Sequence, residues 1–163
     1  MAVSVVAGKI VLDTNVFIGY LRAGLYADWV FGRVNRTIRF LSAVVLMELR
    51  FGADTPRRKR AVDSIQRAFP PGRVIAPVPH VFEHAGRVFR ALHGDGSGLQ
   101  DRLGPLNDLL IALTARQIGA TVVTNNLDEF RRIAVRVPGL RVVAPLSVLE
   151  SRSEKPIGRP SFR

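Results

Sequence analysis

Three acidic residues, Asp13, Glu48 and Asp108, stand where the sequence otherwise predicts buried apolar surface. Asp13 directly follows the apolar run 10–12, which is typical of a strand buried on both faces of a parallel sheet. Ligands of open α/β sheets gather at the carboxyl ends of strands, so this carboxylate is well placed for chemistry. Aspartate also caps helices and opens turns, and for Asp13 alone that interpretation stays open.

Glu48 lies in the middle of a helix that we expect over residues 43–51. Its neighbours on the same helical face include Val44, Val45 and Phe51, all of them apolar. A carboxylate on an apolar stripe is unfavourable unless it is paired, protonated or bound to a metal. An arginine partner or a narrow strip that faces solvent would also explain Glu48.

Asp108 falls in the first turn of a helix expected over residues 106–118, on a face that continues through Ile111, Ala112 and Ala115. The amino end of a helix favours an anion, so we expect Asp108 to stay ionised and available to a cation. An ordinary aspartate of a first helical turn would fit the same pattern.

If Asp13, Glu48 and Asp108 converge, they form a site built only from oxygen ligands. Such a site suits Mg²⁺, or Mn²⁺ as a substitute, because these ions prefer carboxylates and water. Two such ions ~4 Å apart can activate a water and stabilise the leaving oxygen in phosphodiester cleavage. The net charge of +11 and the pI near 11.5 indicate an anionic partner, with nucleic acid expected first and an acidic protein second.

The elements that position these residues alternate between helical and β-prone stretches. This pattern predicts an α/β domain whose central, mostly parallel sheet of four to five strands is covered on both faces. The length of 163 residues suits one domain, expected over 1–150, followed by a loose basic tail over 151–163. The expected strands lie near 10–12, 37–41, 73–76, 121–124 and 140–144, and the expected helices within 17–34 and near 43–51, 56–69, 79–93, 106–118, 129–134 and 145–150.

Composition excludes several classes of protein. The chain has no cysteine, so disulfides and thiolate metal sites are excluded. No apolar run approaches the ~18 residues of a membrane span, and the beginning of the chain does not look like a signal peptide. We therefore expect a cytoplasmic protein that does not associate with membranes.

Four stretches, 10–15, 41–52, 107–115 and 119–130, together resemble the PIN-domain family, and within it the VapC-type toxins of bacterial toxin–antitoxin pairs. The resemblance extends from residue 10 to about 144 and is weak over 53–104. It implies a three-layer α/β/α domain and a Mg²⁺-dependent endoribonuclease that cleaves RNA and inhibits translation and growth. It also implies an antitoxin that blocks the site, and a homodimer or a toxin–antitoxin hetero-oligomer.

The resemblance places the catalytic and metal-binding carboxylates on Asp13, Glu48 and Asp108, and a hydroxyl position on Thr124. The fourth carboxylate of the family falls on Asn126, which is an amide here, and either Asp128 or Glu129 could take its place. Three residues are expected to position the carboxylates without binding the metal themselves: Thr14, Asn15 and Thr124.

Two other functions remain open at this stage. An aspartyl-nucleophile phosphatase also begins with a strand that ends in Asp, but it needs a second carboxylate two residues later, where this chain has Asn15. A non-catalytic basic module that binds RNA or protein would need no metal. For any protein partner we expect an acidic segment that contacts exposed apolar residues near Phe17, Tyr20, Trp29 and Phe31.

Overall fold

The computed structural model describes residues 6–95 and 102–145, and its centre is a five-stranded parallel sheet. The strand order is β3-β2-β1-β4-β5, so the chain first builds outwards from β1 on one side and then crosses to the other. The predicted α/β class and the parallel sheet are confirmed. The strands are β1 Gly8–Leu12, β2 Thr37–Ser42, β3 Val74–Ile75, β4 Thr121–Val123 and β5 Arg141–Val143.

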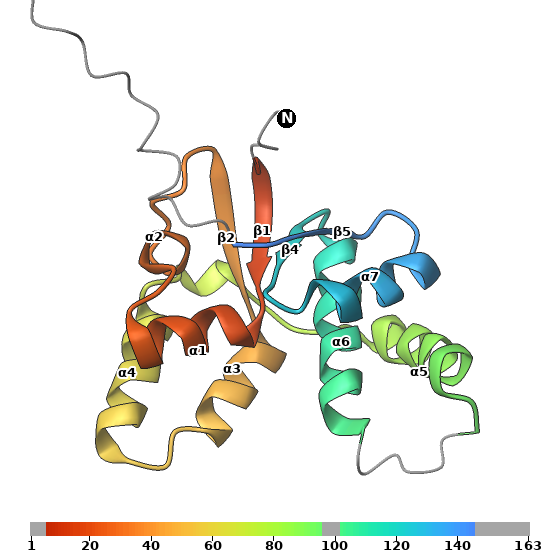
Figure 1. The fold of residues 1–163 in the computed structure, drawn as a ribbon, viewed down its shortest axis with the longest axis horizontal. Helices are drawn as coiled ribbons and strands as arrows, with labels where there is room; N and C mark the ends of the chain where they lie inside the picture. The colour runs from red at the N-terminus through yellow and green to blue at the C-terminus, as the bar shows by residue number, and fades with distance from the viewer. Residues whose placement is uncertain (1–5, 96–101, 146–163) are drawn as a thin grey trace, which may run out of the picture.

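Seven α-helices and one short 3-10 helix connect the strands in the described part of the chain. Figure 1 shows α1 to α4 on one side of the strands and α5 to α7 on the other, which gives the expected three layers. Connections between parallel strands are right-handed. A right-handed connection places its helices on one face of the sheet when the chain moves from β1 towards β3, and on the other face when it moves back towards β5. The elements are α1 Thr14–Ala23, α2 Ala27–Val30, α3 Ala43–Phe51, α4 Pro56–Arg67, η1 Pro71–Arg73, α5 Pro79–His93, α6 Leu103–Gln117 and α7 Leu127–Arg136.

Local sequence sets most helix ends. The Ser42 hydroxyl accepts a hydrogen bond from the Val44 N–H at 3.2 Å and so begins α3. Gly24 ends α1 in the left-handed conformation, at a φ of 67°, which glycine adopts without strain. The helix α6 begins at Leu103, earlier than the expected start at 106. Asp108 therefore does not lie in the first turn, as predicted, but further along the helix.

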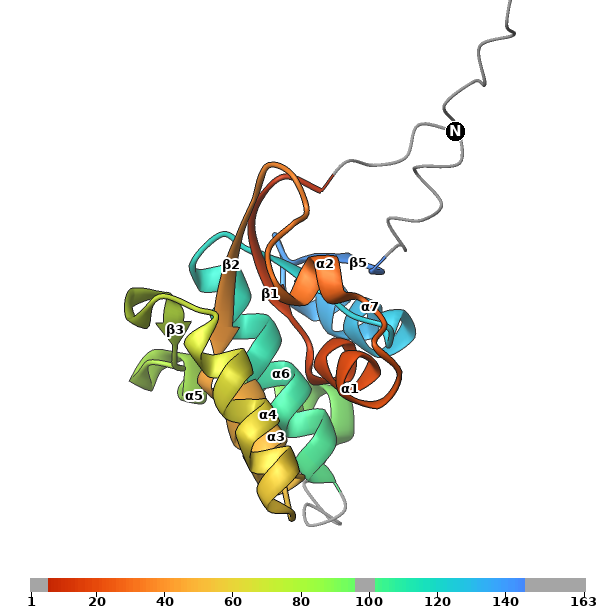
Figure 2. The same ribbon diagram turned by 90° about the vertical axis from the view of Figure 1, so that its left-hand side faces the viewer.

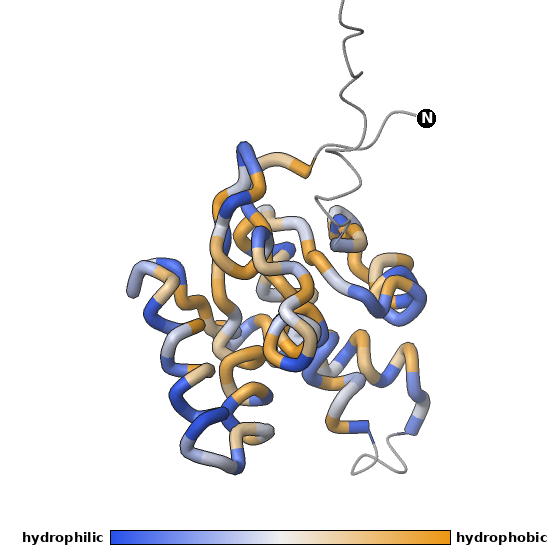
Figure 3. Tube along the Cα trace, turned by 60° about the vertical axis from the view of Figure 1, so that its left-hand side comes forward, coloured by the Kyte–Doolittle hydropathy of each residue, from blue (hydrophilic) through white to orange (hydrophobic). Residues whose placement is uncertain are grey.

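The core lies between the two helical layers, and β1 and β4 form its centre. Ile10, Val11, Val122 and Val123 are completely buried. Figure 3 shows apolar segments gathered along the interior strands and long hydrophilic stretches in the outer helices. Figure 2 shows the ribbon turned by 90°, with α6 behind β1 and β2 in this view.

Two sequence-based expectations about the surface need comment. Phe17 and Trp29 are 0% and 5% exposed, so these two residues belong to the core and are not exposed as expected, whereas Tyr20 and Phe31 are partly buried. No helix in the described ranges combines the length and apolar character needed to cross a membrane. The expected tail over 151–163 lies outside the described residues, and so does the last expected helical turn, 145–150, from residue 146 on.

One half-buried cation joins three elements of the layer that carries α1 to α4. The Arg39 guanidinium, on β2, donates hydrogen bonds to the carbonyl oxygen of Val30, at the end of α2, and to that of Ala68 at 3.1 Å, just beyond α4. It also lies 4.3 Å from the centre of the Phe69 ring. This one side chain satisfies two carbonyls that the helix ends leave without an intrahelical partner.

We predict that Arg39→Ala lowers the free energy of unfolding by about 2–3 kcal/mol, because two carbonyls lose a charged donor and a ring loses its cation. Urea denaturation measures the effect. The matched control is Arg87→Ala, at an exposed position of α5, which should change stability little. Equal losses in the two variants would contradict a structural role for Arg39.

Candidate active site

The site begins where β1 and β4 end side by side. Their last residues are in register, and the Asp13 N–H donates to the Val123 carbonyl at 2.9 Å. The Thr124 hydroxyl donates to Oδ2 of Asp13 at 2.7 Å, and the Thr14 N–H donates to Oδ1 at 2.7 Å. Asp13 is only 4% exposed and caps α1, so the capping interpretation is confirmed, and the catalytic interpretation stays a prediction. The strand order reverses at this position, and open α/β sheets bind ligands at such switch points.

A small amide network fixes Thr124 in turn. Its oxygen accepts hydrogen bonds from the Asn15 side-chain amide at 3.2 Å and from the Asn126 N–H at 2.9 Å. The Asn15 carbonyl oxygen accepts from the Asn125 N–H at 3.1 Å, and the Tyr26 hydroxyl donates to the Asn125 side chain at 3.2 Å. The contribution of Tyr26 could not be predicted, since Tyr26 and Asn125 lie 99 positions apart in the chain.

Thr14 contacts two carboxylates. Its backbone N–H binds Asp13, but its hydroxyl donates to Oε1 of Glu48 at 2.8 Å. Glu48 is partly buried, whereas Phe51 on the same helix is 93% exposed. The buried face of α3 thus includes Val44 and Val45 but ends before Phe51. Glu48 therefore lies at the edge of this buried face, beside α1.

Asp108 completes the acidic cluster from the opposite helical layer. Burial raises the pKa of its carboxyl to about 7, and repulsion from Asp13, Glu48 and Glu129 adds to the shift. The prediction that Asp108 stays readily ionised is therefore wrong, because the residue lies away from the helix end and close to other acids. Burial likewise raises the pKa of Asp13, with a smaller contribution from Glu48, although hydrogen bonds from Thr124 and Thr14 oppose the shift.

The three candidates for the fourth metal ligand differ in exposure. Glu129 is partly buried near the start of α7 and interacts electrostatically with Asp108, whereas Asn126 and Asp128 are exposed. Four elements thus direct carboxylates toward one edge of the sheet: the end of β1, α3, α6 and α7. Within the described ranges, no three His, Cys, Asp or Glu side chains are close enough together, as they stand, to enclose one ion. The arrangement is a loose acidic cluster made of oxygen donors.

The chain is similar to several known proteins. The family model of the PIN domain matches residues 10–136. The solved DNA-bound VapBC from Salmonella typhimurium shows 28% identity and a TM-score of 0.62, covering 85% of this chain and 98% of that chain. VapBC-1 from nontypeable Haemophilus influenzae shows 25% identity and a TM-score of 0.59, with coverages of 84% and 98%. FitAcB from Neisseria gonorrhoeae shows 26% identity and a TM-score of 0.59, with coverages of 83% and 97%. No curated protein sequence matches the chain.

The raised pKa of Asp108 predicts a pH dependence of stability in the absence of divalent ions. Because the folded pKa of about 7 exceeds the ordinary value of 3.8, folding favours the protonated form. Stability is therefore greatest at low pH and falls as the pH rises through about 7. Asp108→Asn should remove this loss and exceed the wild type by roughly 1–3 kcal/mol at about pH 8, a range reduced for solvent screening.

Urea denaturation in EDTA, over a pH series from about 4 to about 8, measures this difference. The two curves should approach each other towards the acidic end and meet below the ordinary pKa of 3.8, where Asp108 is protonated in the folded and the unfolded protein. Parallel curves across the series would show that Asp108 is not in the repulsive environment described above.

A second prediction concerns Thr124. Thr124→Val keeps the shape of the side chain but removes the donor to Asp13 and the acceptor used by Asn15 and Asn126, so stability should fall by about 1–3 kcal/mol. Thr124→Ser keeps the hydroxyl and is the matched control. Urea denaturation at neutral pH compares the two, and equal losses would mean that the methyl group matters and the hydroxyl does not.

Proposed function

The chain belongs to the PIN domain family, and from this membership we propose that it is a metal-dependent endoribonuclease. One observation carries the proposal: carboxylates from four separate elements lie close enough at the switch point of the sheet to repel one another, and this repulsion contributes to raising the pKa of Asp108 to about 7. Buried like charges are unfavourable for folding, and a bound cation would relieve their repulsion. Acidic clusters maintained at such a position are typical of functional sites.

The chemistry of the donors fits Mg²⁺ or Mn²⁺. The cluster contains carboxylate oxygens and no histidine or cysteine, which is the ligand type that these hard cations prefer. We propose that Asp13, Glu48 and Asp108 hold the ion and that Glu129 supplies the fourth carboxylate. When bound, such an ion activates a water and neutralises charge on the phosphate.

The remaining residues of the site position the carboxylates. Thr124 and the Thr14 N–H each bind one oxygen of Asp13, so its carboxyl plane is fixed. The Thr14 hydroxyl binds Oε1 of Glu48, which sets the orientation of the second oxygen. Asn15 is bound to Thr124 and Asn125, and it offers no second carboxylate. This arrangement supports a nuclease and argues against the phosphatase alternative.

We further propose that the nuclease is the toxin of a type II toxin–antitoxin pair. The similar solved structures are VapBC and FitAcB proteins, and they match over nearly their whole length. Under this proposal the partner is an antitoxin that blocks the acidic cluster, and the basic chain, with its net charge of +11, would suit a partner with an acidic binding segment. A homodimer or a toxin–antitoxin hetero-oligomer is the assembly that this proposal implies.

We predict that Asp13→Asn, Glu48→Gln and Asp108→Asn each reduce Mg²⁺-dependent RNA cleavage at least about a hundredfold, because each removes a charged oxygen from the reaction centre. Asp128→Asn, at an exposed position beside Glu129 in the first turn of α7, is the matched control and should cleave normally. Purified protein is incubated with total RNA in Mg²⁺, in Mn²⁺ and in EDTA, and the new RNA ends are mapped.

Cleavage at the wild-type rate by any of the three variants would remove that residue from the proposed ligand set. Cleavage that persists in EDTA would contradict metal dependence.

For the toxin proposal, expression of the chain alone should stop growth, and co-expression of the protein encoded beside it should relieve the arrest. A chain that is harmless when expressed alone would contradict a toxin role.

A further inference from the structure

Tyr26 joins the two helical layers beside the acidic cluster. It lies between α1 and the four-residue helix α2, in the layer that carries α1 to α4. Its hydroxyl donates a hydrogen bond at 3.2 Å to the side-chain carbonyl oxygen of Asn125. Asn125 belongs to the short loop between β4 and α7, and α7 lies in the opposite layer (Figure 1). One phenol hydroxyl thus connects the turn after α1 to the loop that leads into α7.

Two features of the chain place the ring of Tyr26 at this position, and both are unfavourable by themselves. The backbone of Tyr26 is left-handed, with a φ of 59°, which residues with a side chain rarely adopt. The ring also lies against Gly19 in α1, where an added β-carbon would be 2.9 Å from Cε2 of the ring. Glycine weakens the interior of a helix, so its presence here is explained by the room that the ring needs. Strained conformations of this kind are concentrated at functional sites.

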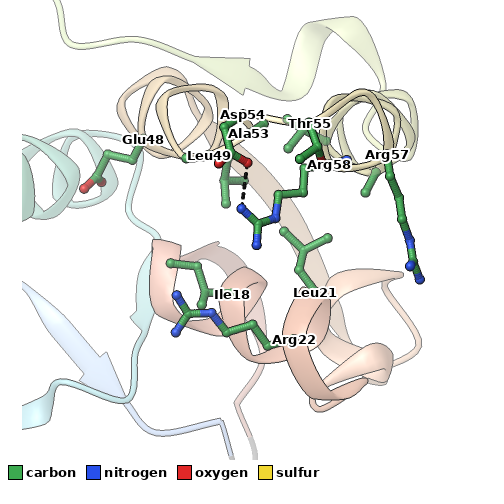
Figure 4. Close-up of a pocket in the computed structure, with 13 residues that line it drawn as sticks. Ile18, Leu21, Arg22, Glu48, Leu49, Ala53, Asp54, Thr55, Arg57 and Arg58 are labelled. Atoms are coloured by element: carbon green, nitrogen blue, oxygen red, sulfur yellow. Dashed lines mark hydrogen bonds and ion pairs between the residues drawn. The ribbon is translucent and has the colours of Figure 1, made fainter.

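Gly19 and Asn15 lie one turn apart on the same stripe of α1. The adjoining face of the helix carries Ile18, which points towards α3 (Figure 4). The Asn15 side chain accepts a hydrogen bond from the Asn125 N–H at 3.1 Å, while the Tyr26 hydroxyl binds the side chain of the same residue. Asn125 is therefore bound at its main chain and at its side chain by two residues of one helical layer.

The loop bound in this way determines where α7 begins. Asn126 is the N-cap of α7, but its side chain makes no capping hydrogen bond. The start of the helix depends instead on the Asn126 N–H, which donates to the Thr124 hydroxyl at 2.9 Å. Glu129, the proposed fourth carboxylate, lies in the first turn of α7. A shift of the loop would therefore move Glu129 relative to Asp108.

We propose that Tyr26 is a positioning residue of the active site, which holds the loop 124–126 and thereby keeps Glu129 beside the other carboxylates. The inference rests on the proposed nuclease function and adds a residue that acts only through Asn125. Gly19 is the second part of this arrangement, because a side chain there would displace the ring. A displacement of ~1 Å at a reacting group can lower a rate by about a hundredfold, so the loss of this bond should be measurable in kcat.

The first measurement is hydrogen–deuterium exchange of the full chain in EDTA, which does not depend on activity. Tyr26→Phe removes the hydroxyl and keeps the ring, so the amides over 125–130 should exchange about threefold faster or more. The matched control is Tyr20→Phe, which removes the same atom from a ring packed edge-on against Phe31, with 5.1 Å between the ring centres. This control should leave exchange over 125–130 unchanged. Equal exchange there in the wild type and in Tyr26→Phe would overturn the proposal.

The second measurement is the kinetics of RNA cleavage in saturating Mg²⁺. Tyr26→Phe should lower kcat about tenfold and leave KM within about twofold, because the change affects the reaction centre and not the binding of RNA. Gly19→Ala should lower kcat in the same way, since the added methyl group displaces the ring. The double variant should be no slower than the slower single variant, because both changes act through one hydrogen bond. Losses that multiply in the double variant would contradict this coupling, and urea denaturation checks that every variant is folded.

The two measurements separate this inference from the proposed function. A wild-type chain that cleaves no RNA in Mg²⁺ would contradict the nuclease proposal, and hydrogen exchange would still decide whether Tyr26 holds the loop. A wild type that cleaves RNA, with an unchanged kcat in Tyr26→Phe, would contradict the positioning role alone, even if exchange over 125–130 became faster.

Discussion

The burial of one carboxylate between two parallel strands is the constraint on which the site depends. Asp13 is 4% exposed, and it can remain there because the ends of β1 and β4 bring it a hydroxyl and a backbone N–H. The Asn15–Thr124–Asn125 network then fixes the donor itself. These contacts link residues more than a hundred positions apart. The sheet therefore has to form before the carboxylate is stable in its place.

Around this centre, positive and negative charge are separated in space. Acids from both helical layers meet at the carboxyl edge of the sheet, and arginines outnumber acids on the outer helices such as α4. The fold accepts an unfavourable concentration of negative charge at one point, as functional sites commonly do. A basic exterior beside an acidic cluster can attract a polyanion and still offer oxygen ligands to a cation.

Much of this architecture could be predicted from sequence, because strands buried on both faces and capped helices leave strong local patterns. The expected helices 43–51 and 79–93 coincide with α3 and α5. Asp13 and Glu48 stood out because carboxylates are rare on apolar surfaces. The environment of Asp108 could not be predicted, since it depends on where α6 begins and on three acids from other elements. The bond from Thr14 to Glu48 and the position of Arg39 likewise arise only from tertiary packing.

The central claim is that repulsion among these carboxylates is relieved by a divalent cation. Thermal unfolding of the wild type and of Asp108→Asn, each with EDTA and with saturating Mn²⁺, tests it most directly. The account predicts that Mn²⁺ raises the Tm of the wild type clearly and that of Asp108→Asn much less. An unchanged Tm in the wild type, or an equal rise in both proteins, would contradict it.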